Sequence, residues 1–156
     1  MEPKQIAARI AQLLTAIESL LPEYLADPLD LQISQGNVAV CIIDGPGNVY
    51  GKMFNGTNGD RLRQRECYRV AWTKASQVWL TGIKTYEYEK LVFTGQIDAA
   101  KFGIKHPDFI GWEGGQPISL DADTHLSVGF SGMRGTSDLS IVQRAMKLPP
   151  AQPVSV

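Results

Sequence analysis

The residue that most directly suggests chemistry is a lysine on the apolar face of a predicted helix. Residues 61–80 read RLRQRECYRVAWTKASQVWL, and each residue of a helix advances about 100° around its axis. Lys74 falls within one broad face that otherwise holds Cys67, Tyr68, Val70, Ala71, Trp72, Ala75, Val78 and Trp79. An unpaired buried charge is costly, which leaves two interpretations. Lys74 either forms a structural ion pair or extends to water, or it points into a polar pocket and faces a ligand.

Glu113 and His106 are the candidate partners of Lys74 in a catalytic site. A carboxylate beside a desolvated lysine shifts the pKa of both groups, so Glu113 and Lys74 could work as an acid–base couple. His106 could take the same role or bind a haem iron axially, although a lone loop histidine is more often a surface residue. Cys41 and Cys67 lie in apolar surroundings without metal-type spacing, so no metal site is predicted.

Aromatic residues and glycines gather in two segments that could form the wall of a pocket. The first reads Tyr86-Glu87-Tyr88-Glu89, and the second runs from Phe109 to Gly115. Large aromatics beside glycines suit a site where the backbone approaches a ligand closely, although an aromatic lid packed on the core would look the same. The predicted ligand-binding residues are Tyr68, Trp72, Tyr86, Phe109, Trp112, Gly114, Gly115 and Asn55.

Composition narrows the class of protein. The chain has 156 residues, 44% hydrophobic and 20% charged, with a net charge of -1, so it offers no basic field for nucleic acid or anionic lipid. Neither a signal peptide nor a membrane-spanning segment is evident, and a cytoplasmic protein is the default expectation. Motifs of nucleotide-binding loops, zinc proteases and serine hydrolases are lacking.

The order of predicted elements indicates an α+β domain. An amphipathic helix ends at Pro22, and strands are predicted at residues 31–33, 38–43, 49–54, 117–120 and 126–130. Helices are predicted at residues 61–80, 85–91, 96–102 and from Thr136 or Ser137 onward. Hairpin connections then favour an antiparallel sheet of about five strands flanked by helices. We expect one domain over residues 1–148 and a flexible Pro-rich tail over 149–156.

Four segments carry motifs of one known family, in that family's order. They are NVAVCIIDGPGNVYGKMFNG at 37–56, CYRVAWTKASQVWLTG at 67–82, GWEGGQPISL at 111–120 and LSVGFSGMRGTSDLSIVQRAM at 126–146. Each motif is weak alone, but together they resemble the GlcG/HbpS family, which is haem-degrading-domain-like and PduO C-terminal-domain-like. The resemblance implies a profilin-like fold with a five-stranded antiparallel sheet, assembly into a homo-oligomer, and a tetrapyrrole or other small molecule as ligand.

Departures from the family pattern refine the functional expectation. Tyr68, Trp72 and Trp79 stand where the family usually has small residues, and Glu113 stands where a proline is typical. These changes suggest a pocket reshaped for a small, aromatic metabolite near Lys74. The sequence therefore predicts a small-molecule-binding protein. A cofactor-independent isomerase, cyclase or lyase that uses Lys74 with an acidic or histidine partner is the alternative, and a purely structural accessory subunit is the third possibility.

Overall fold

The fold is an antiparallel sheet between two layers of helices. A computed structural model describes residues 1–54, 60–104 and 107–149 of the chain. The elements are α1 (Pro3–Leu25), α2 (Pro28–Ser34), β1 (Val38–Asp44), β2 (Val49–Phe54), α3 (Arg61–Thr81), α4 (Thr85–Phe93), a 3₁₀ turn (Ala99–Phe102), β3 (Gly115–Ser119), β4 (His125–Ser131) and α5 (Gly135–Lys147). In this part of the chain the strands form one sheet in the order β2-β1-β4-β3. The α+β class is confirmed, but the sheet has four strands, so the expectation of five was wrong.

The expected fifth strand, at residues 31–33, is part of helix α2. Pro28 occupies the first turn, and the Asp27 side chain accepts hydrogen bonds from the backbone N–H groups of Leu29 (2.9 Å) and Asp30 (3.3 Å). These bonds pair backbone N–H groups that have no acceptor within the first turn of a helix, and proline is favoured in that turn. The spacing of Leu31 and Ile33 resembles a strand, yet both side chains are about half exposed on a short surface helix.

Helix α1 also differs from expectation at its end. It continues through Pro22 to Leu25, whereas the sequence suggested that Pro22 would end it. A proline inside a helix removes one backbone hydrogen bond. Leu20 and Leu21 are buried immediately before it, and we attribute the continuation to this packing on the core.

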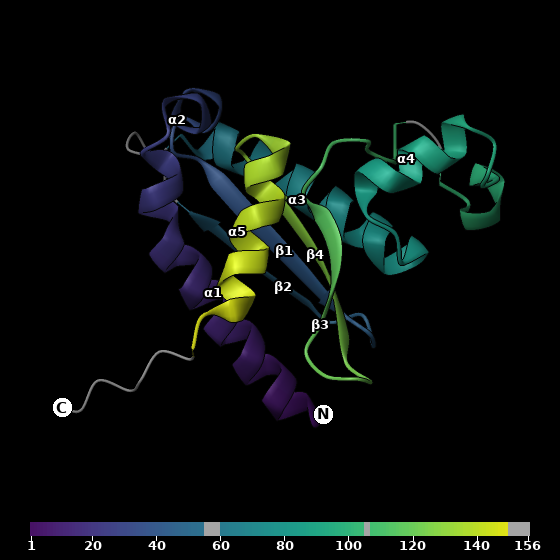
Figure 1. Cartoon of the computed structure of the whole chain (residues 1–156), viewed down its shortest axis with the longest axis horizontal. Helices are drawn as coiled ribbons and strands as arrows, with labels where there is room; N and C mark the ends of the chain where they lie inside the picture. The colour runs from purple at the N-terminus through teal and green to yellow at the C-terminus, as the bar shows by residue number, and fades with distance from the viewer. Residues whose placement is uncertain (55–59, 105–106, 150–156) are drawn as a thin grey trace.

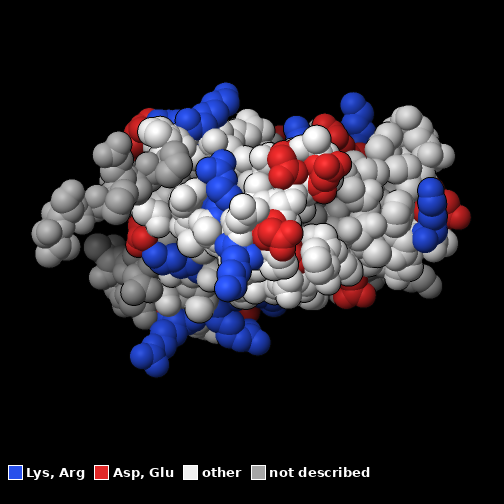
Figure 2. Space-filling view, turned by 90° about the horizontal axis from the view of Figure 1, so that it is seen from below, with Lys and Arg blue, Asp and Glu red and all other residues white. Residues whose placement is uncertain are grey.

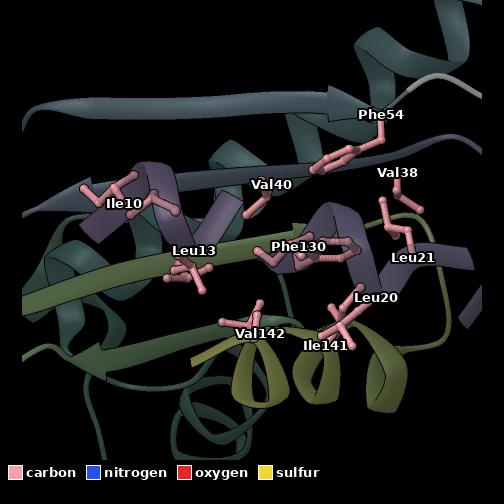
Figure 3. Close-up of a cluster of buried hydrophobic side chains, with 14 of the residues drawn as sticks. Ile10, Leu13, Leu20, Leu21, Val38, Val40, Phe54, Phe130, Ile141 and Val142 are labelled. Atoms are coloured by element: carbon pink, nitrogen blue, oxygen red, sulfur yellow. The ribbon is translucent and has the colours of Figure 1, made fainter. Parts of the chain in front are cut away.

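The central strand β1 separates two apolar layers. Val38, Val40 and Ile42 face the main core beneath α1 and α5, together with Phe130 and further residues from both helices (Figure 3). Ala39, Cys41 and Ile43 face α3 instead, where they meet Ala71 and Ala75. Figure 1 shows α1 and α5 on one side of the sheet and α3 on the other. All seven residues of β1 are buried, which confirms the expected central strand covered on both faces.

Helix α3 packs so close to β4 that a side chain at Gly129 would not fit, and this places Lys74 beside the end of that strand. A Cβ atom at Gly129 would overlap the Ala71 carbonyl oxygen and would lie 2.6 Å from the Ala75 backbone nitrogen. A glycine in the strand opposite alanines in the helix therefore sets the short spacing. As expected, Asp60 caps the start of α3, through a 3.1 Å bond from the Arg63 amide, and Gly82 ends it with a positive φ of 72°.

The surface carries both signs of charge. On the face drawn in Figure 2, lysine and arginine side chains alternate with groups of acidic side chains rather than forming a continuous basic field. Among the described residues, no helix is both long and apolar enough to cross a membrane.

Candidate functional site

Lys74 forms a buried ion pair with Asp138. Its Nζ donates hydrogen bonds to the Phe130 carbonyl oxygen (2.8 Å) and to Asp138 Oδ2 (3.2 Å). The Lys74 and Asp138 side chains are only 3% and 2% exposed. Asp138 Oδ1 accepts a further bond from the Met133 amide at 3.1 Å. The pair therefore joins α3 to the first turn of α5 just beyond the end of β4.

Burial moves the pKa of both partners toward their neutral forms. Desolvation raises the pKa of Asp138 to about 7, against the opposing charge and hydrogen bond of Lys74. Desolvation likewise lowers the pKa of Lys74, while Asp138 acts in the opposite direction. Removing either charge from water is costly, and their mutual attraction recovers part of that cost. Burial and mutual attraction therefore act in opposite directions on each of the two pKa values.

The ion pair lies at the wall of a cleft of about 820 Å³. The cleft is lined by residues from α2, α3, α4, the loop before β3 and the β4–α5 turn: Ile33, Arg63, Cys67, Lys74, Tyr86, Glu89, Gly111, Trp112, Glu113, Ser131, Gly132, Met133, Gly135 and Asp138. A volume of this size can hold a drug-sized or cofactor-sized molecule. Four residues predicted from the sequence, Lys74, Glu113, Tyr86 and Trp112, come together here.

Gly114 supports the Lys74 ammonium although it does not line the cleft. It has a φ of +115°, and a Cβ atom at this position would lie 2.5 Å from the Phe130 carbonyl oxygen and 2.7 Å from Lys74 Nζ. The absence of a side chain is thus a condition for the position of the ammonium. Gly115, the next residue, donates its amide to Thr85 Oγ1 at 3.3 Å and packs against Thr85 behind the cleft.

Three predicted ligand-binding aromatics lie outside the lining of the cleft. Tyr68 packs against Gly51, and its hydroxyl points to Cys41 Sγ at 3.9 Å. Phe109 is 5% exposed, and its ring meets that of Tyr88 edge to face at 5.7 Å. Trp72 is 48% exposed on the outer part of α3. Asn55 and His106 fall outside the described residues, so their predicted roles stay predictions.

Sequence reasoning missed Asp138 as the partner of Lys74, and with it a second polar cluster behind the cleft. Asp30 is 1% exposed and accepts bonds from the Arg134 amide (3.0 Å), Arg134 Nε (2.9 Å) and Nη2 (3.0 Å), and Ser137 Oγ (2.7 Å). Burial pushes the pKa of Asp30 upward, but the bonds from Arg134 and Ser137 outweigh it and leave the pKa below its ordinary value. The cluster fixes the β4–α5 turn that presents Asp138. The Asp27-Pro28 pair in the sequence is typical of a helix start and could have indicated the helix that carries Asp30.

Metal binding finds little support in the described residues, where no three His, Cys, Asp or Glu side chains lie close enough to hold an ion. Cys67 lines the cleft, but its Sγ donates to the Asn37 carbonyl oxygen at 3.3 Å, and burial raises the pKa of its thiol. A protonated thiol is a poor metal ligand and a poor nucleophile.

Comparison with solved structures identifies the class of fold. No family model matches the sequence, and no curated protein matches it. The crystal structure of Klebsiella pneumoniae protein ORFY, a DUF336 protein, superposes with a TM-score of 0.64 at 19% identity over 89% of this chain and 86% of that chain. A PduOC:heme complex gives a TM-score of 0.59 at 20% identity over 92% and 95% of the two chains. A double mutant of Streptomyces reticuli HbpS gives 0.52 at 18% identity over 85% and 83%.

These structural matches confirm the resemblance proposed from the sequence motifs. The chain has the GlcG/HbpS-like fold, with the sheet and its two helical layers matched over most of its length. At this level of identity the likeness concerns the fold, because one fold hosts many functions. Function has to be argued from the cleft itself.

Proposed function

We propose that this protein binds a small organic molecule in the cleft beside Lys74. The observation that carries the proposal is the buried Lys74–Asp138 ion pair at the wall of an 820 Å³ cleft with two exposed aromatic residues, Tyr86 and Trp112. A large cavity with a few convergent polar groups is the usual form of a ligand site. The PduOC:heme complex, which shares the fold, shows that a protein of this architecture can hold a small molecule.

Most described side chains of the cleft that could bind a haem iron are already engaged. Cys67 carries a thiol whose pKa is raised by burial, Lys74 is held in its ion pair, and Met133 is packed into the hydrophobic core. These three groups are thus engaged or protonated, and Tyr86 is the remaining described side chain of the cleft whose type can bind haem iron axially. His106, the predicted axial ligand, lies outside the described residues. We therefore propose a small metabolite with an aromatic body in preference to a tetrapyrrole.

A direct test is native mass spectrometry of the purified protein, repeated after denaturation. We expect a bound small molecule in the wild type and in Lys147→Met, a control that removes an exposed lysine outside the cleft. We expect loss of that molecule from Lys74→Met and from Trp112→Ala. The second substitution should leave the fold intact because the Trp112 side chain is 68% exposed. A molecule retained by both cleft variants would contradict the proposed site.

An enzymatic role is the second candidate, and the pKa of Asp138 favours it. A carboxyl group with a pKa of about 7 beside a desolvated lysine can give and take protons at physiological pH. Such a pair suits a cofactor-independent isomerase, cyclase or lyase. Incubating the bound metabolite with the protein in D₂O tests this role: deuterium should enter the metabolite with wild type and not with Asp138→Asn. Absence of deuterium exchange with both proteins would rule out this enzymatic role and leave ligand binding as the only function of the cleft.

We also propose that the protein assembles into a homo-oligomer, as the family resemblance implies. Trp72, Trp79 and Leu80 are each more than 40% exposed on α3 and give that helix an apolar outer surface. Exposed apolar patches often mark interaction surfaces. Native mass spectrometry reports the subunit number, and substitution of Trp72 and Trp79 by serine should lower it if this surface is the interface. The single domain over 1–148 and the cytoplasmic location stay predictions.

A further inference from the structure

The cleft has an excess of negative charge. Its lining contains two cationic side chains, Arg63 and Lys74, against three carboxylates, Glu89, Glu113 and Asp138. Lys74 and Asp138 neutralise each other in their ion pair. Arg63 donates from Nη2 to the Ile33 carbonyl oxygen at 2.7 Å. This bond leaves the charge of Arg63 in place, so outside the ion pair the lining holds two carboxylates, Glu89 and Glu113, against one cation.

Among the described residues, no side chain forms a hydrogen bond or close ion pair with the carboxylates of Glu89 and Glu113, although both are half-buried; Glu113 interacts with the Lys74 charge only at longer range. Two glycines make room for these carboxylates. A Cβ atom at Gly111 would overlap the Glu89 carboxylate, and one at Gly135 would lie 2.7 Å from Glu113 Oε2. A carboxylate out of bulk water gains more from a cation than one on an open surface. Both groups are thus positioned to meet a positive ligand.

Two exposed aromatic rings accompany these carboxylates. Trp112 is 68% exposed and directly precedes Glu113, while Tyr86 is 54% exposed and lies on α4, three residues before Glu89. The faces of tryptophan and tyrosine rings attract organic cations, and they also stack on aromatic bodies. Rings and carboxylates in one cleft form a setting that recognises amines.

We propose that the ligand of this cleft is an organic ammonium compound, an amine attached to an aromatic body, which places its positive group near Glu113 and Glu89 and its ring against Trp112 and Tyr86. This inference rests on the proposed binding function and specifies the chemical class of the ligand. An anionic ligand of the same shape would meet two carboxylates and a single cation, Arg63, that is already hydrogen-bonded to the Ile33 carbonyl oxygen. The Lys74–Asp138 pair, neutral as a whole, would contact the polar substituents of the ring.

A matched series of indole compounds tests the charge of the ligand. Tryptamine, tryptophol and indole-3-propionate place an ammonium, a hydroxyl and a carboxylate on the same ring through the same two-carbon chain. Isothermal titration calorimetry at pH 7.5 should give the tightest binding for tryptamine, about tenfold tighter than for tryptophol, and the weakest for indole-3-propionate.

Substitutions of the two cleft carboxylates, Glu89 on α4 and Glu113 in the loop before β3, test the inference, and Glu87 provides the matched control. Glu89→Gln and Glu113→Gln should each reduce the preference for tryptamine over tryptophol by severalfold without changing tryptophol binding. Glu87→Gln removes the same charge two residues from Glu89, at an exposed position that does not line the cleft, and should leave the preference intact.

The outcomes separate this inference from the proposed function. Tighter binding of indole-3-propionate, lost in Lys74→Met, would overturn the ammonium inference and leave the cleft as the binding site. Equal affinity for the three compounds, or no binding of any of them, would also overturn the inference. In that case the native mass spectrometry experiment still decides whether the cleft binds another molecule, because it tests whether a copurified molecule is lost in Lys74→Met.

Discussion

Replacing Lys74 by methionine should destabilise the fold in a manner that depends on pH. Methionine keeps the length and apolar character of the side chain but removes the ammonium, so Asp138 loses its partner while it remains 2% exposed. Breaking a buried ion pair by deleting one partner costs about 3 kcal/mol or more. For a chain of this size, that loss lowers the melting temperature by roughly 6–12 °C.

The pH dependence follows from the raised pKa of Asp138. The folded protein holds the Asp138 proton with a pKa of about 7, whereas the ordinary value is 3.8. The folded state thus binds this proton more tightly, and the associated stability is present below pH 3.8 and lost as the pH rises through about 7. In Lys74→Met the pKa of Asp138 rises further. At pH 5 the Asp138 carboxyl group is neutral and no buried charge is left unpaired, so the substitution should cost less than at pH 8, about 2 kcal/mol for the lost hydrogen bonds of the ammonium.

The assay is urea unfolding of wild type, Lys74→Met, Asp138→Leu and the double variant at pH 5 and pH 8. The double variant replaces the pair by two apolar side chains and should recover most of the stability lost in each single variant, because no unpaired charge remains. Lys147→Met, an exposed substitution on the last turn of α5, should change the unfolding free energy by less than about 0.5 kcal/mol at both pH values. Additive effects of the two single variants, or a cost for Lys74→Met that is the same at pH 5 and pH 8, would refute the reasoning.

Three further substitutions test the parts that hold the cleft. Gly114→Ala should destabilise the protein by more than about 1 kcal/mol and abolish ligand binding, because φ is +115° and the new Cβ would lie 2.5 Å from the Phe130 carbonyl oxygen; thermal unfolding and calorimetry measure the two effects. Trp112→Ala should leave the unfolding free energy within about 0.5 kcal/mol of wild type but weaken ligand binding at least tenfold, whereas Trp72→Ala, equally a surface change, should leave binding intact. Asp30→Asn should cost about 2 kcal/mol in urea unfolding, since a buried carboxylate that accepts four hydrogen bonds would lose its charge, and an unchanged midpoint would show that this cluster does not hold the turn.

Local pattern predicted the elements of this fold better than it predicted their partners. The helical wheel placed Lys74 on an inward face, and the capping residues Asp60 and Gly82 marked the ends of α3 correctly. Asp138 was noted only as an acidic residue in the first turn of a helix, where the helix dipole already accounts for it. Its partner, Lys74, lies 64 positions earlier in the chain, and helical or strand periodicity cannot predict a contact over that sequence separation.

The aromatic residues show the same limit. Tyr86 and Trp112 line the cleft, whereas Phe109, from the same segment as Trp112, forms an aromatic contact with Tyr88. Composition alone cannot tell which of two neighbouring rings faces a ligand and which packs on the core. Helix α2 was missed for a related reason, because the alternation of Leu31 and Ile33 suits a strand while the Asp27 cap and Pro28 start a helix.

The position of the cleft explains why a ligand there should stabilise the whole domain. Helices α3 and α5 lie on opposite sides of the sheet (Figure 1). The ion pair between Lys74 of α3 and Asp138 of α5 therefore connects the two layers beyond the end of β4. Asp30 and Arg134 fix the same turn from α2. A molecule bound against this junction contacts elements from both layers, and any ligand that binds only the folded state adds to its stability by mass action. The size of that increase at a known ligand concentration gives the affinity of the cleft, and Lys74→Met should abolish it.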